Sequence, residues 1–123
     1  MLRYRANAFN VAIHIRRGDI VSAKDINANH TLRWLNNDYF VTVLQNTLNI
    51  ITTNKKVTIY LFSQGIESDF IEFKKFSNLN YCLDMGAMDS FLHMVYADVL
   101  ICSKSSFSYM PALLNDGTKI VPK

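Results

Sequence analysis

The chain has 123 residues, of which half are hydrophobic and 19% are charged. This length and apolar content predict one domain with its own core, because two domains would need a longer chain. The net charge of +3 comes from separated basic pairs rather than a basic stripe, which argues against a nucleic-acid partner. No apolar run reaches membrane-spanning length and the start lacks a signal peptide, so we expect no stable membrane insertion and a cytoplasmic protein.

Short apolar runs alternate with longer amphipathic ones along the first half of the chain. Residues 11–15 are β-rich and continuously apolar, which predicts a strand buried on both faces. Residues 20–36 form a polar stretch whose length is typical of a functional loop. Apolar residues at helical spacing between 40 and 51 predict a helix with Asn37 as its N-cap, and residues 56–63 predict a second strand.

The second half of the chain repeats this alternation. The pattern predicts, in order, a short helix at 70–76, a strand at 79–84, a helix capped by Asp89, a strand at 99–103, a helix at 105–115 and a strand at 119–122. Strands that alternate with helices imply an α/β fold, a parallel sheet of about five strands with helices on both faces. Cys82 and Cys102 lie in apolar runs without CxxC spacing, so we expect buried, reduced thiols.

Three polar segments follow predicted strands, at the sheet edge where such folds bind ligands. They are residues 16–19, 63–65 and 103–106, the last of which begins the final helix. A helix N-terminus with hydroxyl groups attracts anions, and arginine adds paired donors that keep their charge. Together these segments predict a site for a diphosphate.

Each of these residues also has a purely structural explanation. Serines before a helix are usually N-caps, and His14, in mid-strand, is more often a hydrogen-bonded core residue than a general base. The arginine pair can form an ion pair with Asp19 or Asp38. Residues 17–19 also spell an integrin-adhesion tripeptide, Arg-Gly-Asp. These alternatives, including a doubly wound domain without any ligand, stay open beside the diphosphate site.

Several common nucleotide motifs are absent from the sequence. It contains neither GxGxxG nor GxxxxGK[ST], which argues against NAD, FAD and P-loop nucleotides. It has no DxD motif to chelate a metal-bound nucleotide sugar. We therefore expect no metal and no cofactor, with arginine neutralising the phosphates.

Three sequence motifs resemble those of a known enzyme family. HIRRGD (residues 14–19), LFSQG (61–65) and SKSSFSYMPALLN (103–115) resemble, in order, the three motifs of the α-1,2-fucosyltransferase family. They also resemble the wider GDP-fucose-dependent superfamily that includes α-1,6- and protein O-fucosyltransferases. Gln64 departs from the acidic residue usual in the second motif, and Tyr109-Met110 from the paired tryptophans often found in the third.

The resemblance implies the C-terminal, donor-binding half of a GT-B enzyme, with residues 1–123 as one Rossmann-like domain and the N-terminal acceptor domain not present. It implies metal-independent, inverting transfer from GDP-fucose to a glycan acceptor. We expect a fragment that is not active alone, and a Golgi location if the parent enzyme is eukaryotic. The alternative is a non-catalytic nucleotide or nucleotide-sugar binding module.

The resemblance also implies roles for individual residues. Arg16 would hold the β-phosphate and stabilise the departing GDP. Arg17 and Asp19 would shape the loop and support it, with Asp19 as a second catalytic residue. The sequence does not identify the general base: His14 and Asp19 are the only nearby candidates, and the N-terminal domain is the other source. The donor-binding residues it implies are His14, Arg17, Ser63, Asp89 (at the base or ribose), Ser105, Ser106 and Phe107.

Overall fold

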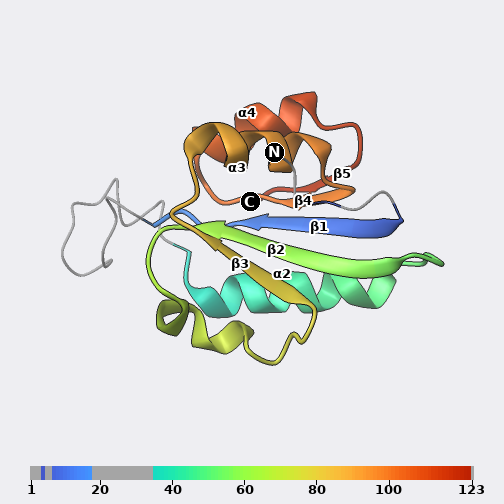
Figure 1. Cartoon of the computed structure of the whole chain (residues 1–123), viewed down its shortest axis with the longest axis horizontal. Coiled ribbons are helices and arrows are strands. Elements are labelled where there is room, and N and C mark those ends of the chain that lie inside the picture. Colours follow the sequence, from blue (N-terminus) through green and yellow to red (C-terminus); the bar gives the residue numbers. More distant parts are fainter. Residues whose placement is uncertain (1–3, 5–6, 18–34, 123) are drawn as a thin grey trace.

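The computed structural model describes residue 4, residues 7–17 and residues 35–122. These residues form one five-stranded, all-parallel sheet, which confirms the predicted α/β fold (Figure 1). The strands are β1 (Ala8–His14), β2 (Lys56–Ser63), β3 (Leu79–Leu83), β4 (Val99–Ile101) and β5 (Thr118–Ile120). Their order across the sheet is β3-β2-β1-β4-β5, a Rossmann-like arrangement.

Helices cover both faces of the sheet, as predicted. They are α2 (Asn37–Ile50), the 3-10 helix η1 (Glu67–Phe73), α3 (Ala87–Tyr96) and α4 (Ser106–Leu114). Helices α2 and η1 lie on one face, and α3 and α4 lie on the other (Figure 1). Within the described residues, no helix has the length and apolar character that crossing a membrane requires.

The structure changes two predicted N-caps, and it places the short helix at Glu67–Phe73 rather than at 70–76. The N-cap of α2 is Asn36, whose Oδ1 accepts a hydrogen bond from Tyr39 N, so the prediction of Asn37 was wrong by one residue. Asn37 instead accepts a bond from Arg17 and donates to Asp69 O. Asp89 does not cap α3 either: Gly86 is the N-cap, and Asp89 lies in the first turn. A carboxylate there still interacts favourably with the helix dipole.

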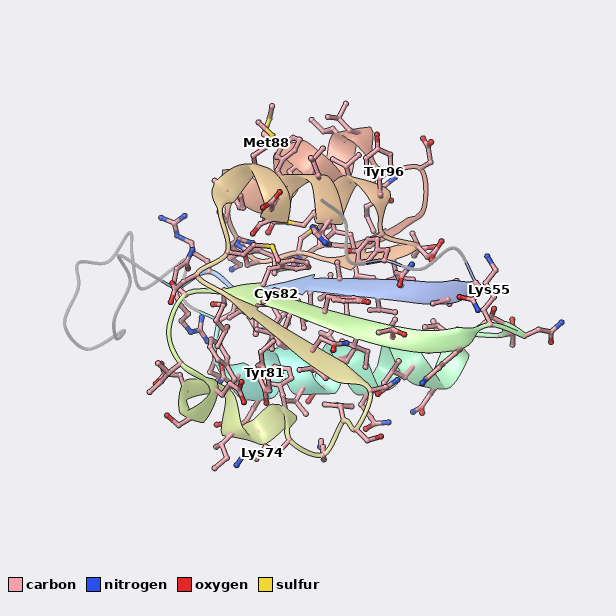
Figure 2. All side chains as sticks on the ribbon, viewed as in Figure 1. Lys55, Lys74, Tyr81, Cys82, Met88 and Tyr96 are labelled. Carbon is pink, nitrogen blue, oxygen red and sulfur yellow. The ribbon has the colours of Figure 1, made fainter. Side chains whose placement is uncertain are left out.

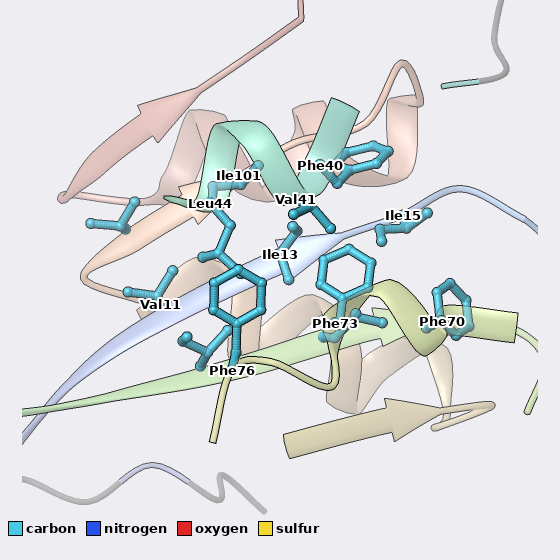
Figure 3. Packing of buried hydrophobic residues seen from close by; sticks show 13 residues of the cluster. Val11, Ile13, Ile15, Phe40, Val41, Leu44, Phe70, Phe73, Phe76 and Ile101 are labelled. Carbon is cyan, nitrogen blue, oxygen red and sulfur yellow. The ribbon is translucent and has the colours of Figure 1, made fainter. Parts of the chain in front are cut away.

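The central strand β1 is buried on both faces, which explains its continuous apolar sequence. Val11, Ile13 and Ile15 pack in a cluster with α2 and the phenylalanines of η1 (Figure 3). Ala12 packs in a second cluster under α3 and α4. The alternation recurs at the edge of the sheet, where Tyr81 packs on the first cluster and its neighbour Cys82 belongs to the second (Figure 2).

Both cysteines are free and buried, as the sequence predicted. Burial raises the pKa of the Cys102 thiol to about 11. The thiol is therefore protonated at neutral pH and is a poor nucleophile.

The direction in which the chain builds the sheet reverses at β1. From β1 the chain adds β2 and β3 on one side, and then returns to add β4 and β5 on the other. The helices that follow β1 and β4 in the described residues, α2 and α4, lie on opposite faces of the sheet. In doubly wound sheets such an arrangement opens a crevice at the carboxyl ends of the two strands, where ligands bind.

Asn115 ties the end of α3 to the start of β5. Its Nδ2 lies 2.8, 2.9 and 2.8 Å from the carbonyl oxygens of Met94, Val95 and Ala97. Its Oδ1 accepts a hydrogen bond of 2.6 Å from Gly117 N. The side chain is buried, so these carbonyl groups have no ready substitute in water.

We predict that Asn115→Ala lowers the free energy of unfolding by about 1–3 kcal/mol for each carbonyl or amide group that is left buried without a partner. Urea denaturation followed by circular dichroism measures this change. Asn54→Ala is the control, because Asn54 is exposed and its loss is expected to change stability by less than about 0.5 kcal/mol. Equal effects of the two substitutions would contradict the assigned role of Asn115.

Candidate functional site

A cavity of about 290 Å³ opens at the carboxyl ends of β1 and β2, beside the starts of α3 and α4. Residues from all three segments singled out in the sequence line it. The lining residues are His14, Arg16, Phe62, Ser63, Gln64, Met85, Ala87, Ser90, Ser105 and Phe107. The cavity thus lies at the crevice that the strand order predicts.

Arg16 is held against the start of α4. Its Nη1 donates a hydrogen bond of 3.2 Å to Ser105 Oγ. Ser105 is the N-cap of α4, and the same oxygen accepts a bond of 3.1 Å from Phe107 N. Two donors therefore occupy the lone pairs of this hydroxyl, and its proton is left to donate. The sequence predicted that Arg16 and the final helix would meet, and the structure brings them together at one cavity.

The start of α4 offers fewer amide donors than a bare helix N-terminus. Phe107 N bonds to the Ser105 hydroxyl, and Ser108 N bonds to Ser105 O at 3.0 Å. The start of α4 would therefore stabilise an anion mainly through the positive end of the helix dipole and through the Ser105 hydroxyl. The Arg16 guanidinium adds a full charge to that partial one.

Ser63 fixes the backbone from which Arg16 projects. Its Oγ donates a hydrogen bond of 2.6 Å to Ile15 O, the carbonyl directly before Arg16. Ile15 N in turn donates to Phe62 O at 3.0 Å. The end of β1 is thus hydrogen-bonded to the end of β2 by both backbone and side chain. Ser63 in this way helps to position Arg16.

His14 is buried and lines the cavity, and the hydrogen-bonding partners of its Nδ1 are two residues that do not line it. That nitrogen makes hydrogen bonds with the hydroxyls of Ser103, at 2.9 Å, and Ser108. Burial, and secondarily the charge of Arg16, lower the pKa of the imidazole to about 4. The ring is therefore neutral at pH 7.

Arg17 extends away from the cavity, although it neighbours Arg16. Its guanidinium donates to Arg16 O at 2.7 Å, Leu35 O at 2.8 Å and Asn37 Oδ1 at 2.9 Å. Burial lowers its pKa to about 10, against the opposing influence of Glu72. These bonds hold the start of α2, so the structure gives Arg17 a structural role. Direct contact with a donor remains a prediction.

The other predicted site residues fall into two groups. Asp89 does not line the cavity, and its carbonyl accepts a hydrogen bond of 2.6 Å from His93 Nδ1. Asp19 and the side chain of Ser106 lie outside what the structure describes. The predicted roles of all three are untested.

Five lining residues were not predicted as ligand contacts: Phe62, Gln64, Met85, Ala87 and Ser90. Gln64 was noted only as a departure from a motif. Met85 and Ala87 follow β3, so the rule that selected the ends of the other strands would have found them. Ser90 is buried one turn into α3, and no local sequence signal marks it.

No group of three or more His, Cys, Asp or Glu side chains is placed to hold a metal ion within the described residues. Metal independence itself stays a prediction.

The low pKa of His14 predicts how stability depends on pH. The unfolded chain, with a histidine pKa near 6.5, binds a proton in the range between about pH 6.5 and 4 that the folded chain does not bind. The free energy of unfolding should therefore fall as the pH falls through this window, by on the order of 3 kcal/mol. Chemical denaturation at a series of pH values measures it. His14→Asn should lose this part of the slope, and an unchanged slope would contradict the assignment.

Comparison with solved structures identifies relatives by fold. The structure is similar to the fucosyltransferase NodZ from Bradyrhizobium, with a TM-score of 0.59 at 11% identity over 89% of this chain. It is similar to the NodZ α-1,6-fucosyltransferase co-crystallized with GDP (TM-score 0.59, 12% identity) and soaked with GDP-fucose (TM-score 0.58, 12% identity). Each match covers 89% of this chain and 37% of that chain.

These similarities establish the fold alone, because sequence identities this low do not establish a shared function. No family model matches the sequence, and neither does any curated protein. Two of these structures are described as α-1,6-fucosyltransferases, so the comparisons support a fucosyltransferase-like fold and do not single out the α-1,2 family that the motifs resemble. The chain spans little more than a third of the enzyme that it matches.

Proposed function

We propose that this chain is the donor-binding domain of a glycosyltransferase that uses a nucleoside diphosphate sugar. One observation carries the proposal: the Arg16 guanidinium and the N-terminus of α4 meet at a single cavity at the switch point of the sheet. A fixed cation beside the positive end of a helix suits a diphosphate.

The size of the cavity is consistent with part of such a donor. Ligand pockets for whole small molecules occupy about 300–1,000 Å³, and this one, at about 290 Å³, is at the lower end. We infer that it takes the diphosphate and the groups next to it, and that the base or sugar extends beyond it. Phe107 and Met85 provide apolar walls for those groups.

The transfer step uses this charge arrangement directly. The bond between the anomeric carbon and the phosphate oxygen breaks, and its electron pair goes to the leaving diphosphate. An acceptor hydroxyl bonds to the opposite side of that carbon and gives its proton to a base. Arg16 and the Ser105 end of α4 stabilise the negative charge that builds on the leaving group, and such donors act most strongly on developing charge.

We propose GDP-fucose as the donor and a glycan as the acceptor. Two observations support this choice: the three motifs listed above, and the fold shared with an α-1,6-fucosyltransferase whose structures were obtained with GDP and GDP-fucose. The linkage formed, inversion at the anomeric carbon, and a metal-free reaction belong to the same proposal.

We predict that GDP and GDP-fucose bind this chain without a metal and stabilise it by about 2.7 kcal/mol at a hundredfold their Kd. UDP and ADP should give less. Arg16→Ala should weaken GDP binding by about 10- to 150-fold, because it removes charged hydrogen bonds to the diphosphate. Arg16→Lys should recover only part of the affinity, because lysine keeps the charge and loses the paired geometry. Thermal shifts and calorimetric titration measure these effects.

Lys74→Ala is the control, since this exposed lysine follows η1, away from the cavity lining. It removes a positive charge and should leave GDP affinity unchanged. Failure of every nucleotide to bind, or equal binding by Arg16→Ala, would refute the proposal. Binding without transfer to any glycan in the longest available form of the protein would favour the non-catalytic binding module.

A further inference from the structure

Three buried side chains beside the cavity form a closed hydrogen-bonding triangle. Its members are His14 Nδ1 and the hydroxyls of Ser103 and Ser108. The two hydroxyl oxygens lie 3.1 Å apart, and Ser103 N donates to Ser108 Oγ at 3.2 Å. Ser103 is 1% exposed and Ser108 is 0% exposed, so water cannot complete the hydrogen bonds of their hydroxyls or of the His14 Nδ1 that they contact. Each buried proton of this cluster therefore needs an acceptor within the cluster itself.

Consider first the tautomer that carries its proton on Nε2, which leaves a lone pair on Nδ1. Ser108 then donates to His14 Nδ1, and its two lone pairs accept from the hydroxyl and the backbone N–H of Ser103. Each buried hydroxyl proton has an acceptor, and Ser108 Oγ reaches its full capacity of one donated and two accepted bonds. Nothing in the triangle is unsatisfied.

The opposite tautomer, with the proton on Nδ1, leaves one proton without an acceptor. Nδ1–H and Ser103 N–H would take both lone pairs of Ser108 Oγ, and Ser108 would donate to Ser103 Oγ. The Ser103 hydroxyl proton would then have no acceptor. Within the described residues this hydroxyl contacts only His14 and Ser108, whose acceptor lone pairs are all in use or protonated. An unsatisfied buried donor is costly, so this arrangement is disfavoured.

From this proton count we infer that Ser103 and Ser108 hold His14 as a neutral Nε2–H donor directed at the cavity. The ring lines the cavity and its Nδ1 is taken by the serines, which leaves the opposite nitrogen for a ligand. His14 then donates a hydrogen bond to an acceptor oxygen of the bound ligand, next to the charge of Arg16. Ser103 and Ser108 are positioning residues that act through the imidazole.

This assignment rests on the proposed function for the ligand's identity, and it changes one part of that function. An Nε2 that already carries a proton cannot take one from an acceptor hydroxyl. His14, one of two candidates for the general base in the sequence analysis, is therefore excluded from that role. Its contribution to the site is recognition of the donor.

Nitrogen-15 NMR of the ligand-free chain at pH 7 tests the tautomer without any nucleotide. Long-range ¹H–¹⁵N correlations separate a protonated from an unprotonated ring nitrogen, and His14→Gln identifies the His14 signals by their loss. We expect Nε2 protonated and Nδ1 unprotonated in the wild type. An Nδ1-protonated population should appear in Ser103→Ala/Ser108→Ala. Thr47→Val, which removes a buried hydroxyl on α2, should leave the spectrum unchanged.

Calorimetric titration with GDP tests the ligand contact. His14→Gln places an amide N–H near the position of Nε2–H and should keep affinity within about threefold, whereas His14→Leu should lose about tenfold or more. A wild-type imidazole protonated on Nδ1, or a tautomer unchanged in the double serine variant, would overturn the inference while GDP binding persists. If wild-type GDP binding is absent, the proposed function fails and the ligand contact fails with it. The NMR result would still decide the tautomer.

Discussion

The hydrogen bond from Arg16 to Ser105 joins the two halves of this fold at the point where the sheet reverses direction. Arg16 follows β1 and Ser105 caps the helix after β4, and these two neighbouring strands are followed by helices on opposite faces of the sheet. The bond places a full positive charge beside the positive end of a helix dipole, an arrangement that an anion would stabilise. The cavity and its proposed chemistry depend on this contact.

The rest of the fold keeps this contact in place. Apolar residues pack against β1 from both faces, and Ser63 bonds the carbonyl before Arg16. Arg17, the next residue, extends the opposite way and bonds the start of α2. The two adjacent arginines thus have different roles: Arg16 lines the cavity, and Arg17 holds the start of α2. This division keeps two half-buried guanidinium groups from lying side by side.

Polar side chains around the cavity are arranged as donors. Two donors occupy both lone pairs of Ser105 Oγ, which leaves its hydroxyl proton to donate. Ser103 and Ser108 occupy Nδ1 of His14, which leaves the imidazole proton on Nε2, toward the cavity. Burial keeps the imidazole neutral, so it adds a hydrogen bond without adding a second charge next to Arg16. A diphosphate, which carries several acceptor oxygens, matches such a set of donors.

Much of the architecture followed from local patterns. Continuous apolar runs and their alternation with amphipathic segments predicted five parallel strands with helices on both faces, and polar residues at strand ends pointed to the edge where the cavity lies. Errors arose at helix starts, where Asn36 and Asn37 carry equivalent side chains and only the backbone geometry selects one. Asp89 was misplaced for the same reason, because a carboxylate suits both an N-cap and a first turn.

The class of fold thus followed from the sequence, because the hydrophobic period is set by residues close together in the chain. The sequence also placed Arg16 and the start of the last helix at one edge of the sheet, because the carboxyl ends of parallel strands meet there. Only the tertiary structure decided which of two adjacent arginines faces the cavity, since that depends on contacts with Leu35 and Ser105. It also decided the state of His14. Ser103 and Ser108 are 89 and 94 residues from His14 along the chain, and no local sequence pattern indicates that their hydroxyls contact the imidazole.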